Sequence, residues 1–317
     1  MSARVFSNTY PHTRHGFRDV LRWKIGLGPR ETSRFPEAIM PAARREVNRA
    51  EWRIMPTQGW RVAWLGHSSF FLAGHGLRLL IDPVFSNYCA PFPLYLPAFR
   101  RFQQAACQVA DLPSIDAILL THNHYDHCDL ATLKQFPRET RIICAEGMQG
   151  WLTRKGFTNV TEVAWHASVL LEHDTRITAT AAQHFSSRSF GDRNRKHWCG
   201  WMIEGAGKRL WHAGDSGYCA DFSLIGERFG SIDLSMIPIG AYQPRWFMSP
   251  MHMDPAEAVQ VFLDTRSERA IGMHWGTFRL TDEPAGEPPL LLAEALAAKK
   301  IDPARFVCGE VGEWWEL

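Results

Sequence analysis

The sequence predicts a layered α/β fold in which two β-sheets belong to one unit, and three observations support this. Short apolar segments bounded by glycine, proline and aspartate recur from Arg61 onward, as expected of buried strands. The early segments follow one another closely, whereas the later ones alternate with helical patterns, which favours two sheets over one doubly wound sheet. No linker divides residues 51–317, so we expect this range to be one domain.

Hydrophobic patterns indicate which residues form strands and which form helices. The expected strands are residues 62–65, 69–72, 77–81, 117–120, 141–144, 177–181, 201–203, 209–211, 234–238 and 270–273. Helical patterns lie between them at residues 130–136, 148–155, 255–265 and 290–298. The third helix has the clearest start, because Asp254 suits the N-cap, Pro255 the first helical position and Glu257 the third position after the cap.

Residues 1–50 differ from the rest of the chain. They are rich in arginine and proline, and they hold only one short helix-like stretch, at residues 17–25. We interpret them as an N-terminal extension packed on the body of the protein, which occupies residues 51–317.

The composition excludes several classes of protein. The chain has 317 residues, 45% of them hydrophobic, and 35 Lys and Arg against 33 Asp and Glu give a net charge of +2. This balance argues against a disordered chain, and we expect no nucleic-acid partner because no dense basic stripe is present. The seven cysteines form no C-x-x-C pair, so a thiolate zinc site is not expected.

The same sequence features predict where the protein resides. No apolar run approaches the roughly 18 residues that suggest a membrane-spanning helix. The N-terminus lacks the basic, apolar and small-residue layout of a secretory signal. We therefore expect a cytoplasmic protein without a transmembrane helix.

A cluster of histidines predicts a metal site. Shortly after the apolar segment 117–120 come His122, His124, Asp126 and His127. Three imidazoles and a carboxylate are poor choices for a packed core, because each needs a polar partner when buried. Imidazole nitrogen and carboxylate oxygen suit zinc, manganese or iron.

Three further candidate ligands follow later apolar segments: His184, Asp215 and His274. Taken singly, each could equally be a hydrogen-bonded histidine or a turn aspartate. Together with the first cluster they supply five histidines and two aspartates, which is enough for two metal ions with open coordination positions.

This pattern, H-x-H-x-D-H with a downstream His, Asp and His, resembles that of the metallo-β-lactamase superfamily. Further segments resemble the N-acylphosphatidylethanolamine-hydrolysing phospholipase D family: W-L-G-H-S-S-F at 64–70, D-P-V-F-S at 82–86, A-G-D-S-G-Y-C at 213–219, P-I-G-A-Y-Q-P-R-W-F-M at 238–248 and H-W-G-T-F at 274–278. The resemblance implies a four-layer αββα metallo-β-lactamase sandwich with a dinuclear site along one edge of its two sheets.

The resemblance also implies how the metals are held. His122, His124 and His184 would bind one Zn²⁺, and Asp126, His127 and His274 would bind the other. Asp215 would bridge the two Zn²⁺ ions of each chain, although iron or manganese tolerates the same ligands. Asp126, Asp215 and His252 are the expected catalytic residues.

The activity implied is that of a zinc-dependent phosphodiesterase of the phospholipase D type. It would hydrolyse N-acylphosphatidylethanolamine-like phospholipids to N-acylethanolamine and phosphatidic acid by a metal-bound hydroxide. The alternative is a metal-dependent hydrolase of the same fold that acts on a small soluble substrate, a lactone or a phosphodiester. A metal- or lipid-binding protein without turnover is a third, less favoured reading.

Other residues are candidates for supporting the site. Asp82 is expected to orient a ligating imidazole, or else to cap a turn, and His67 to line the site or make a structural hydrogen bond. His252, with Tyr242 and Arg245 close in sequence, is expected to bind substrate, and a surface histidine is the alternative.

A phospholipid substrate predicts a membrane-facing surface. The segment 88–102, from Tyr88 to Phe102, combines aromatic residues, prolines and arginines, and it suits either a headgroup interface or a packed lid. Arg18, Arg22, Trp23 and Lys24 would add to a peripheral contact with the inner membrane surface. The oligomeric state stays open, with a homodimer as one candidate.

Overall fold

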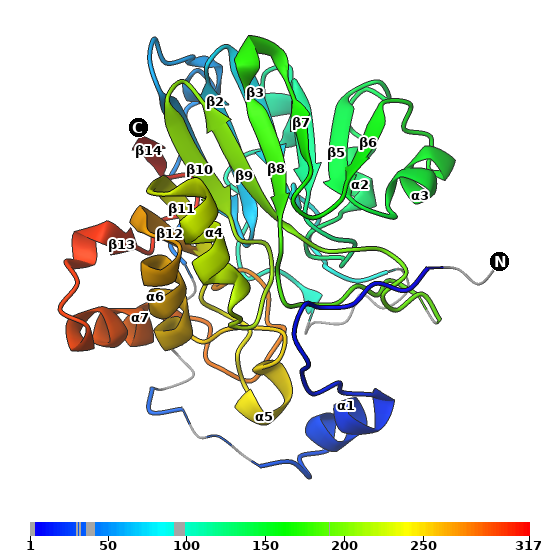
Figure 1. Ribbon diagram of the computed structural model, residues 1–317, viewed down its shortest axis with the longest axis vertical. Helices are drawn as coiled ribbons and strands as arrows, with labels where there is room; N and C mark the ends of the chain where they lie inside the picture. Colours follow the sequence, from blue (N-terminus) through cyan, green and yellow to red (C-terminus); the bar gives the residue numbers. More distant parts are fainter. Residues whose placement is uncertain (1–3, 30, 32, 36–41, 92–98, 190) are drawn as a thin grey trace.

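In the computed structural model, two sheets of seven strands pack against each other, with helices on their outer faces (Figure 1). The structure describes residues 4–29, 31, 33–35, 42–91, 99–189 and 191–317. This arrangement confirms the predicted αββα sandwich. One hydrophobic core includes buried side chains from both sheets, and the indole of Trp60 in one sheet donates to the carbonyl of Gly205 in the other at 3.0 Å.

The first sheet has the order β14-β1-β2-β3-β4-β5-β6. Its strands are β1 (Trp60–Gly66), β2 (Ser69–Gly74), β3 (Leu77–Ile81), β4 (Ala117–Leu120), β5 (Arg141–Ala145), β6 (Val160–Val163) and β14 (Trp314–Glu316). Strands β3 to β6 are parallel neighbours, so their carboxyl ends lie at one edge of the sheet.

The second sheet has the order β13-β12-β11-β10-β9-β8-β7. Its strands are β7 (Ser168–Leu170), β8 (Arg176–Thr180), β9 (Gly200–Gly205), β10 (Lys208–His212), β11 (Ile232–Pro238), β12 (Ser267–Met273) and β13 (Phe306–Val307). Strands β10 to β13 are parallel, whereas β7 to β10 pair antiparallel.

Helices lie on the outer faces of the sandwich and at one of its ends (Figure 1). They are α1 (Phe17–Lys24), α2 (Leu130–Leu133), α3 (Gln149–Arg154), α4 (Asp221–Phe229), α5 (Arg245–Met248), α6 (Pro255–Asp264) and α7 (Glu287–Ala298), with single 3-10 turns at Glu51–Arg53, Val109–Asp111, Glu172–Asp174 and Pro303–Arg305. Helix α3 packs beside β6, and α6 packs on β11 and β12 between α4 and α7.

Each expected strand and helix is present, with shifts at the ends, but the sequence prediction missed β6, β7, β13, β14, α4 and α5. The expected start of α6 is confirmed. The Asp254 carboxylate accepts from the backbone N–H of Glu257 at 2.9 Å, and the Glu257 carboxylate accepts from that of Asp254 at 3.0 Å. Helix α7 begins earlier than expected because its prolines lie in the first turn, where no intrahelical N–H bond is lost.

The N-terminal residues 4–29 run along the loops at one end of the sandwich, and α1 lies beside α5 (Figure 1). Phe6 is buried against Ala182 and Trp198, and Trp23 of α1 contacts Phe247 of α5 with ring centroids 5.2 Å apart. The division of the chain at residue 50 stays a prediction. Among the described residues, no helix is both long and apolar enough to cross a bilayer.

Candidate metal centre

The candidate ligands follow the ends of strands from both sheets. The loop after β4 carries His122, His124, Asp126 and His127, and the predicted supporting residues His67 and Asp82 follow β1 and β3. In the second sheet, the loops after β8, β10 and β12 carry the remaining candidates, His184, Asp215 and His274. The sandwich brings these loops together at one edge, because the two sheets pack face to face with these strand ends on the same side.

One group of four side chains consists of His122, His124, His184 and Asp215, whose ligand atoms all lie within 4.8 Å of one another. Nδ1 of His124 is 3.0 Å from Nε2 of His122 and 3.3 Å from Nε2 of His184. Oδ2 of Asp215 lies 3.8 Å from the His122 nitrogen and 3.7 Å from the His184 nitrogen.

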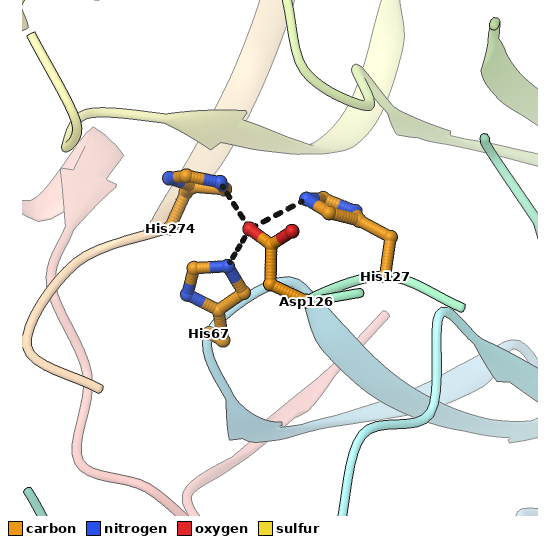
Figure 2. A group of neighbouring side chains, drawn as sticks. All are labelled: His67, Asp126, His127 and His274. Carbon is orange, nitrogen blue, oxygen red and sulfur yellow. Dashed lines mark hydrogen bonds and ion pairs between the residues drawn. The ribbon is translucent and has the colours of Figure 1, made fainter. Parts of the chain in front are cut away.

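A second group lies next to it and is drawn in Figure 2: His67, Asp126, His127 and His274. Oδ2 of Asp126 is surrounded by three Nε2 atoms, that of His67 at 2.9 Å, that of His274 at 3.4 Å and that of His127 at 3.6 Å. The imidazoles converge on this single carboxylate from three different loops.

Asp215 stands between the two groups. Its Oδ2 atom lies 3.1 Å from Nε2 of His127 and 3.1 Å from Nε2 of His274, in addition to its approach to the first group. The structure therefore brings all seven predicted ligands together, with Asp215 where a shared ligand would lie. Their roles as ligands stay predictions.

The chemistry of these side chains fits bound cations. Oδ1 of Asp215 is buried and has no hydrogen-bond partner among the described residues, and Nε2 of His127 and of His274 lie near carboxylate oxygens without the geometry of a hydrogen bond. Unpartnered buried polar atoms are costly unless something else coordinates them. Nitrogen and oxygen donors of this kind are those that zinc, manganese and iron accept.

The electrostatics of the cluster point the same way. Burial lowers the pKa of His184 to about 3 and that of His124 to about 4, so both imidazoles are neutral at pH 7 and keep a lone pair for a metal. Burial also opposes protonation of His274, yet the Asp215 and Asp126 carboxylates raise its pKa to about 9. The two carboxylates therefore stabilise positive charge at this place, whether a proton or a metal carries it.

Asp82 lies next to His127, and its predicted role in orienting a ligand stays a prediction. Its carboxylate accepts from Nδ1 of His127 at 2.7 Å, which directs Nε2 of that ring toward Asp215. The backbone N–H of Thr121 donates to the same carboxylate at 2.8 Å, and its hydroxyl donates as well. Asp82 has a φ of 41°, in the left-handed region, so the fold holds it in an unusual conformation.

His67 contacts the cluster directly. Its Nε2 atom bonds the Asp126 carboxylate at 2.9 Å, and its backbone carbonyl accepts from the N–H of His274 at 3.1 Å. It therefore contacts one candidate ligand through its ring and the loop of another through its backbone, and its role in the site stays a prediction.

The predicted substrate residues lie in different surroundings. The His252 ring is 5.0 Å from that of His184 and 5.2 Å from that of His274, and its buried Nδ1 atom has no hydrogen-bond partner among the described residues. The buried Tyr242 hydroxyl donates to Glu287 at 2.6 Å. Arg245 donates to the His252 carbonyl at 2.9 Å and to Glu257 at 2.7 Å. The substrate roles of all three stay predictions, and His252 alone of them lies against the cluster.

The segment that begins at Tyr88 and ends at Phe102 is described only in part, because residues 92–98 lie outside the described residues. At its end, Arg101 is buried and lies over the Phe278 ring at 5.4 Å. The choice between membrane contact and packed lid stays open.

Sequence reasoning missed two groups that fix ligands. Thr121 contacts the Asp82 carboxylate, and its place between the strand and His122 was the available signal. The carbonyl of Met251 lies 2.9 Å from Nδ1 of His184. Every residue has a backbone carbonyl, so the identity of residue 251 gives no sign of this contact, and only the structure reveals it.

Comparisons with known proteins agree with this geometry. Residues 77–275 match the family model described as "Beta-lactamase superfamily domain". The chain is 31% identical to N-acyl-phosphatidylethanolamine-hydrolyzing phospholipase D 1 of Caenorhabditis elegans, over 99% of this chain and 93% of that protein. It is 36% identical to the mitochondrial N-acyl-phosphatidylethanolamine-hydrolyzing phospholipase D of Saccharomyces cerevisiae, over 79% of this chain and about half (54%) of that protein.

More distant proteins also resemble this chain in sequence or in fold. A UPF0173 metal-dependent hydrolase of Koribacter versatilis is 29% identical over 73% of this chain and 91% of its own length. Among solved structures, the metallo hydrolase Igni18 of Ignicoccus hospitalis aligns with a TM-score of 0.58 and 24% identity, over 82% of this chain and all (100%) of that one. The isothiocyanate hydrolase from Delia radicum gut bacteria aligns with a TM-score of 0.66 and 20% identity, over 81% of this chain and 98% of that one.

Proposed function

From the premise that this chain belongs to the metallo-β-lactamase superfamily and is a metal-dependent hydrolase, we propose that it is a phosphodiesterase of the phospholipase D type. Its substrate would be an N-acylphosphatidylethanolamine-like phospholipid. The observation that carries the proposal is the pair of ligand groups that meet at Oδ2 of Asp215, in a chain similar to two proteins named for this reaction.

We propose that the site holds two Zn²⁺ ions. His122, His124 and His184 would hold one, Asp126, His127 and His274 would hold the other, and Asp215 would touch both. The absence of sulfur among these donors also allows iron or manganese. When bound, such a metal pair supplies a water-derived nucleophile at neutral pH and neutralises charge on a phosphoryl oxygen.

The side chains around this site have separate tasks in the proposed reaction. His67 holds the Asp126 carboxylate in place, and Asp82 fixes the tautomer of His127 by accepting from its Nδ1. Nδ1 of His252 is unpartnered and lies beside both ligand groups, so it is placed to hydrogen-bond a phosphoryl oxygen of the substrate. Hydrolysis would add water across the P–O bond to ethanolamine, giving phosphatidic acid and N-acylethanolamine.

A membrane contact through α1 belongs to this proposal. Phe17, Leu21 and Ile25 recur at intervals of four residues and are 78%, 49% and 57% exposed. Arg18, Arg22 and Lys24 lie in the same short segment. Exposed apolar side chains beside cations suit the interface of an anionic bilayer, where a peripheral enzyme would meet its lipid substrate.

The test is mass spectrometry of the products after metal-loaded protein meets N-acylphosphatidylethanolamine in mixed micelles. The expected result is equal amounts of phosphatidic acid and N-acylethanolamine, absent with the His124→Ala variant. If a protein that carries two metals yields neither product, the phospholipase proposal is wrong. A lactone or a small phosphodiester then becomes the substrate to test.

A further inference from the structure

The side chain of Asn8, in the N-terminal segment, bonds both backbone polar groups of His184. Its Nδ2 donates to the His184 carbonyl at 2.9 Å, and its Oδ1 accepts from the His184 N–H at 3.1 Å. The same Oδ1 accepts from the indole N–H of Trp198 at 2.9 Å. Within a sheet, a neighbouring strand would bond the backbone N–H and carbonyl of such a residue. Here the Asn8 amide makes both of these hydrogen bonds instead.

His184 needs such a partner because it lies beyond the end of its strand. Strand β8 ends at Thr180, and His184 belongs to none of the strands among the described residues. Other candidate ligands have backbone partners in the body of the protein: the N–H of His274 donates to the His67 carbonyl, and that of His127 to the His124 carbonyl. The backbone of His184 is instead held by a residue 176 positions away in the N-terminal segment.

A backbone carbonyl contacts the side chain of His184, and N-terminal residues pack against the cluster of side chains beside that carbonyl. Nδ1 of His184 bonds the Met251 carbonyl, which leaves Nε2 facing His124 and Asp215. Met251 packs in a cluster with Phe247, and Trp23 of α1 packs against this cluster. His15 stacks on the Phe247 ring with centroids 4.7 Å apart.

We propose that Asn8 is a positioning residue for the metal centre. Through Asn8, the N-terminal residues 4–29 would contribute to metal binding. The inference rests on the proposed metal site. Asn8 sets the place of the His184 backbone, and Nε2 of His184 consequently reaches the metal held by the first ligand group. Loss of the Asn8 amide would weaken that metal while leaving the second ligand group intact, because, among the described residues, the hydrogen bonds of the Asn8 side chain go to His12, His184 and Trp198 and to none of the four residues of that group.

The expected size of the effect follows from known metal sites. Removing a group that orients a ligand usually lowers metal affinity about 10–100-fold. A role limited to fastening the N-terminal segment would lower the melting temperature of the metal-free protein and leave both metal affinities unchanged. The two roles are therefore separable by measurement.

The experiment compares the full-length protein with three variants. Asn8→Ala removes every bond, and Asn8→Asp keeps an acceptor for the His184 N–H but removes the donor to its carbonyl. Thr9→Ala is the matched control, since Thr9 is an exposed neighbour. Asn8→Ala is expected to fold, because Trp198 keeps its second acceptor, the Ala182 carbonyl at 2.9 Å.

Zinc affinities are measured by chelator competition, the geometry of the site by the absorption spectrum of the Co²⁺-loaded protein, and stability by melting of the metal-free protein. In Asn8→Ala we expect one metal to bind about 10–100-fold more weakly and the other normally, with an altered cobalt spectrum. Asn8→Asp should also weaken this metal, because its second carboxylate oxygen would face the His184 carbonyl oxygen, and Thr9→Ala should match the wild type.

Two outcomes would overturn the inference. If the wild type binds two metals tightly and Asn8→Ala binds both with the same affinities and cobalt spectrum, the Asn8 proposal fails while the proposed function stands. The same holds if Asn8→Asp matches the wild type when Asn8→Ala does not fold. If the wild type itself binds no metal, the proposed function fails and this inference fails with it.

Discussion

Oδ2 of Asp215 lies 3.1 Å from Nε2 of His274, although the two residues come from loops after different strands. Asp215 follows β10 and His274 follows β12, and these strands flank β11 in parallel. Parallel strands end at the same edge of a sheet, so the topology alone brings the two loops close.

The first prediction concerns this bridging position. Asp215→Asn replaces a charged oxygen that approaches four imidazoles with a neutral amide. We expect the metal content after dialysis to fall and the hydrolysis rate to drop by more than the roughly 10–100-fold typical of groups behind the ligands. Elemental analysis and turnover of a phosphodiester check this. Retention of two tightly bound metals by the variant would contradict the assignment of Asp215.

The second prediction concerns Asp82, which bonds Nδ1 of His127 at 2.7 Å. In Asp82→Asn the amide accepts less strongly, so the ring of His127 is less firmly oriented and metal affinity should fall about 10–100-fold. Asp116→Asn is the control, because Asp116 is exposed and its carboxylate accepts from the Arg78 N–H at the opposite end of the sheet. Equal metal affinities in the two variants, from chelator competition, would remove Asp82 from the metal centre.

The third prediction separates substrate contact from metal binding at His252. We expect His252→Ala to keep both metals and to lose about 10²-fold in kcat, as is typical when a donor to a charged transition state is removed. Metal analysis and steady-state kinetics on the same preparation check both parts. The candidate ligand atoms of Asp215, His252 and His274 lie within 4.8 Å of one another. If His252→Ala loses metal along with activity, His252 is therefore a metal ligand and the assignment to substrate is wrong.

Much of the fold could be predicted from the sequence, because its central strands are continuous apolar runs. Every residue of β1, β2 and β4 is buried, and such strands leave a clear hydrophobic signal. The missed strands are short and lie at the sheet margins. In β7 and β14 no residue is fully buried, so neither apolar runs nor alternation marks them.

The candidate ligands were predictable for a related reason, since each is a titratable residue shortly after an apolar strand. The contacts between loops were not. His67 and Asp126 are 59 positions apart, and Asn8 and His184 are 176 apart, so their meeting depends on tertiary packing that no local pattern records. The hydrogen bonds of Tyr242 to Glu287 and of Arg245 to Glu257 were also unpredictable. The positions of Tyr242 and Arg245 near His252 in the sequence do not indicate which partners they bond.

The fourth prediction concerns the start of α6, which carries the chain away from His252. Asp254→Ala removes the acceptor for the Glu257 N–H and should lower the free energy of unfolding by about 1 kcal/mol. Urea unfolding of the metal-free protein measures it. Asp302 is the control, because its carboxylate accepts from the Ala304 N–H and caps only a single 3-10 turn. Asp302→Ala should lower the free energy of unfolding less than Asp254→Ala does. A larger loss at Asp302 would contradict this account of the cap.

The fifth prediction concerns the exposed apolar side chains of α1. Leu21→Glu places a negative charge among Phe17, Ile25 and the neighbouring cations, so binding to vesicles containing phosphatidylglycerol should weaken. Leu224→Glu on α4 is the matched control, because Leu224 is similarly exposed at 52% but lies on another helix. Co-sedimentation at low and high salt measures both variants, and the charge contribution of Arg18, Arg22 and Lys24 predicts weaker binding of the wild type at high salt. If Leu21→Glu and Leu224→Glu reduce binding equally, α1 is not the membrane contact.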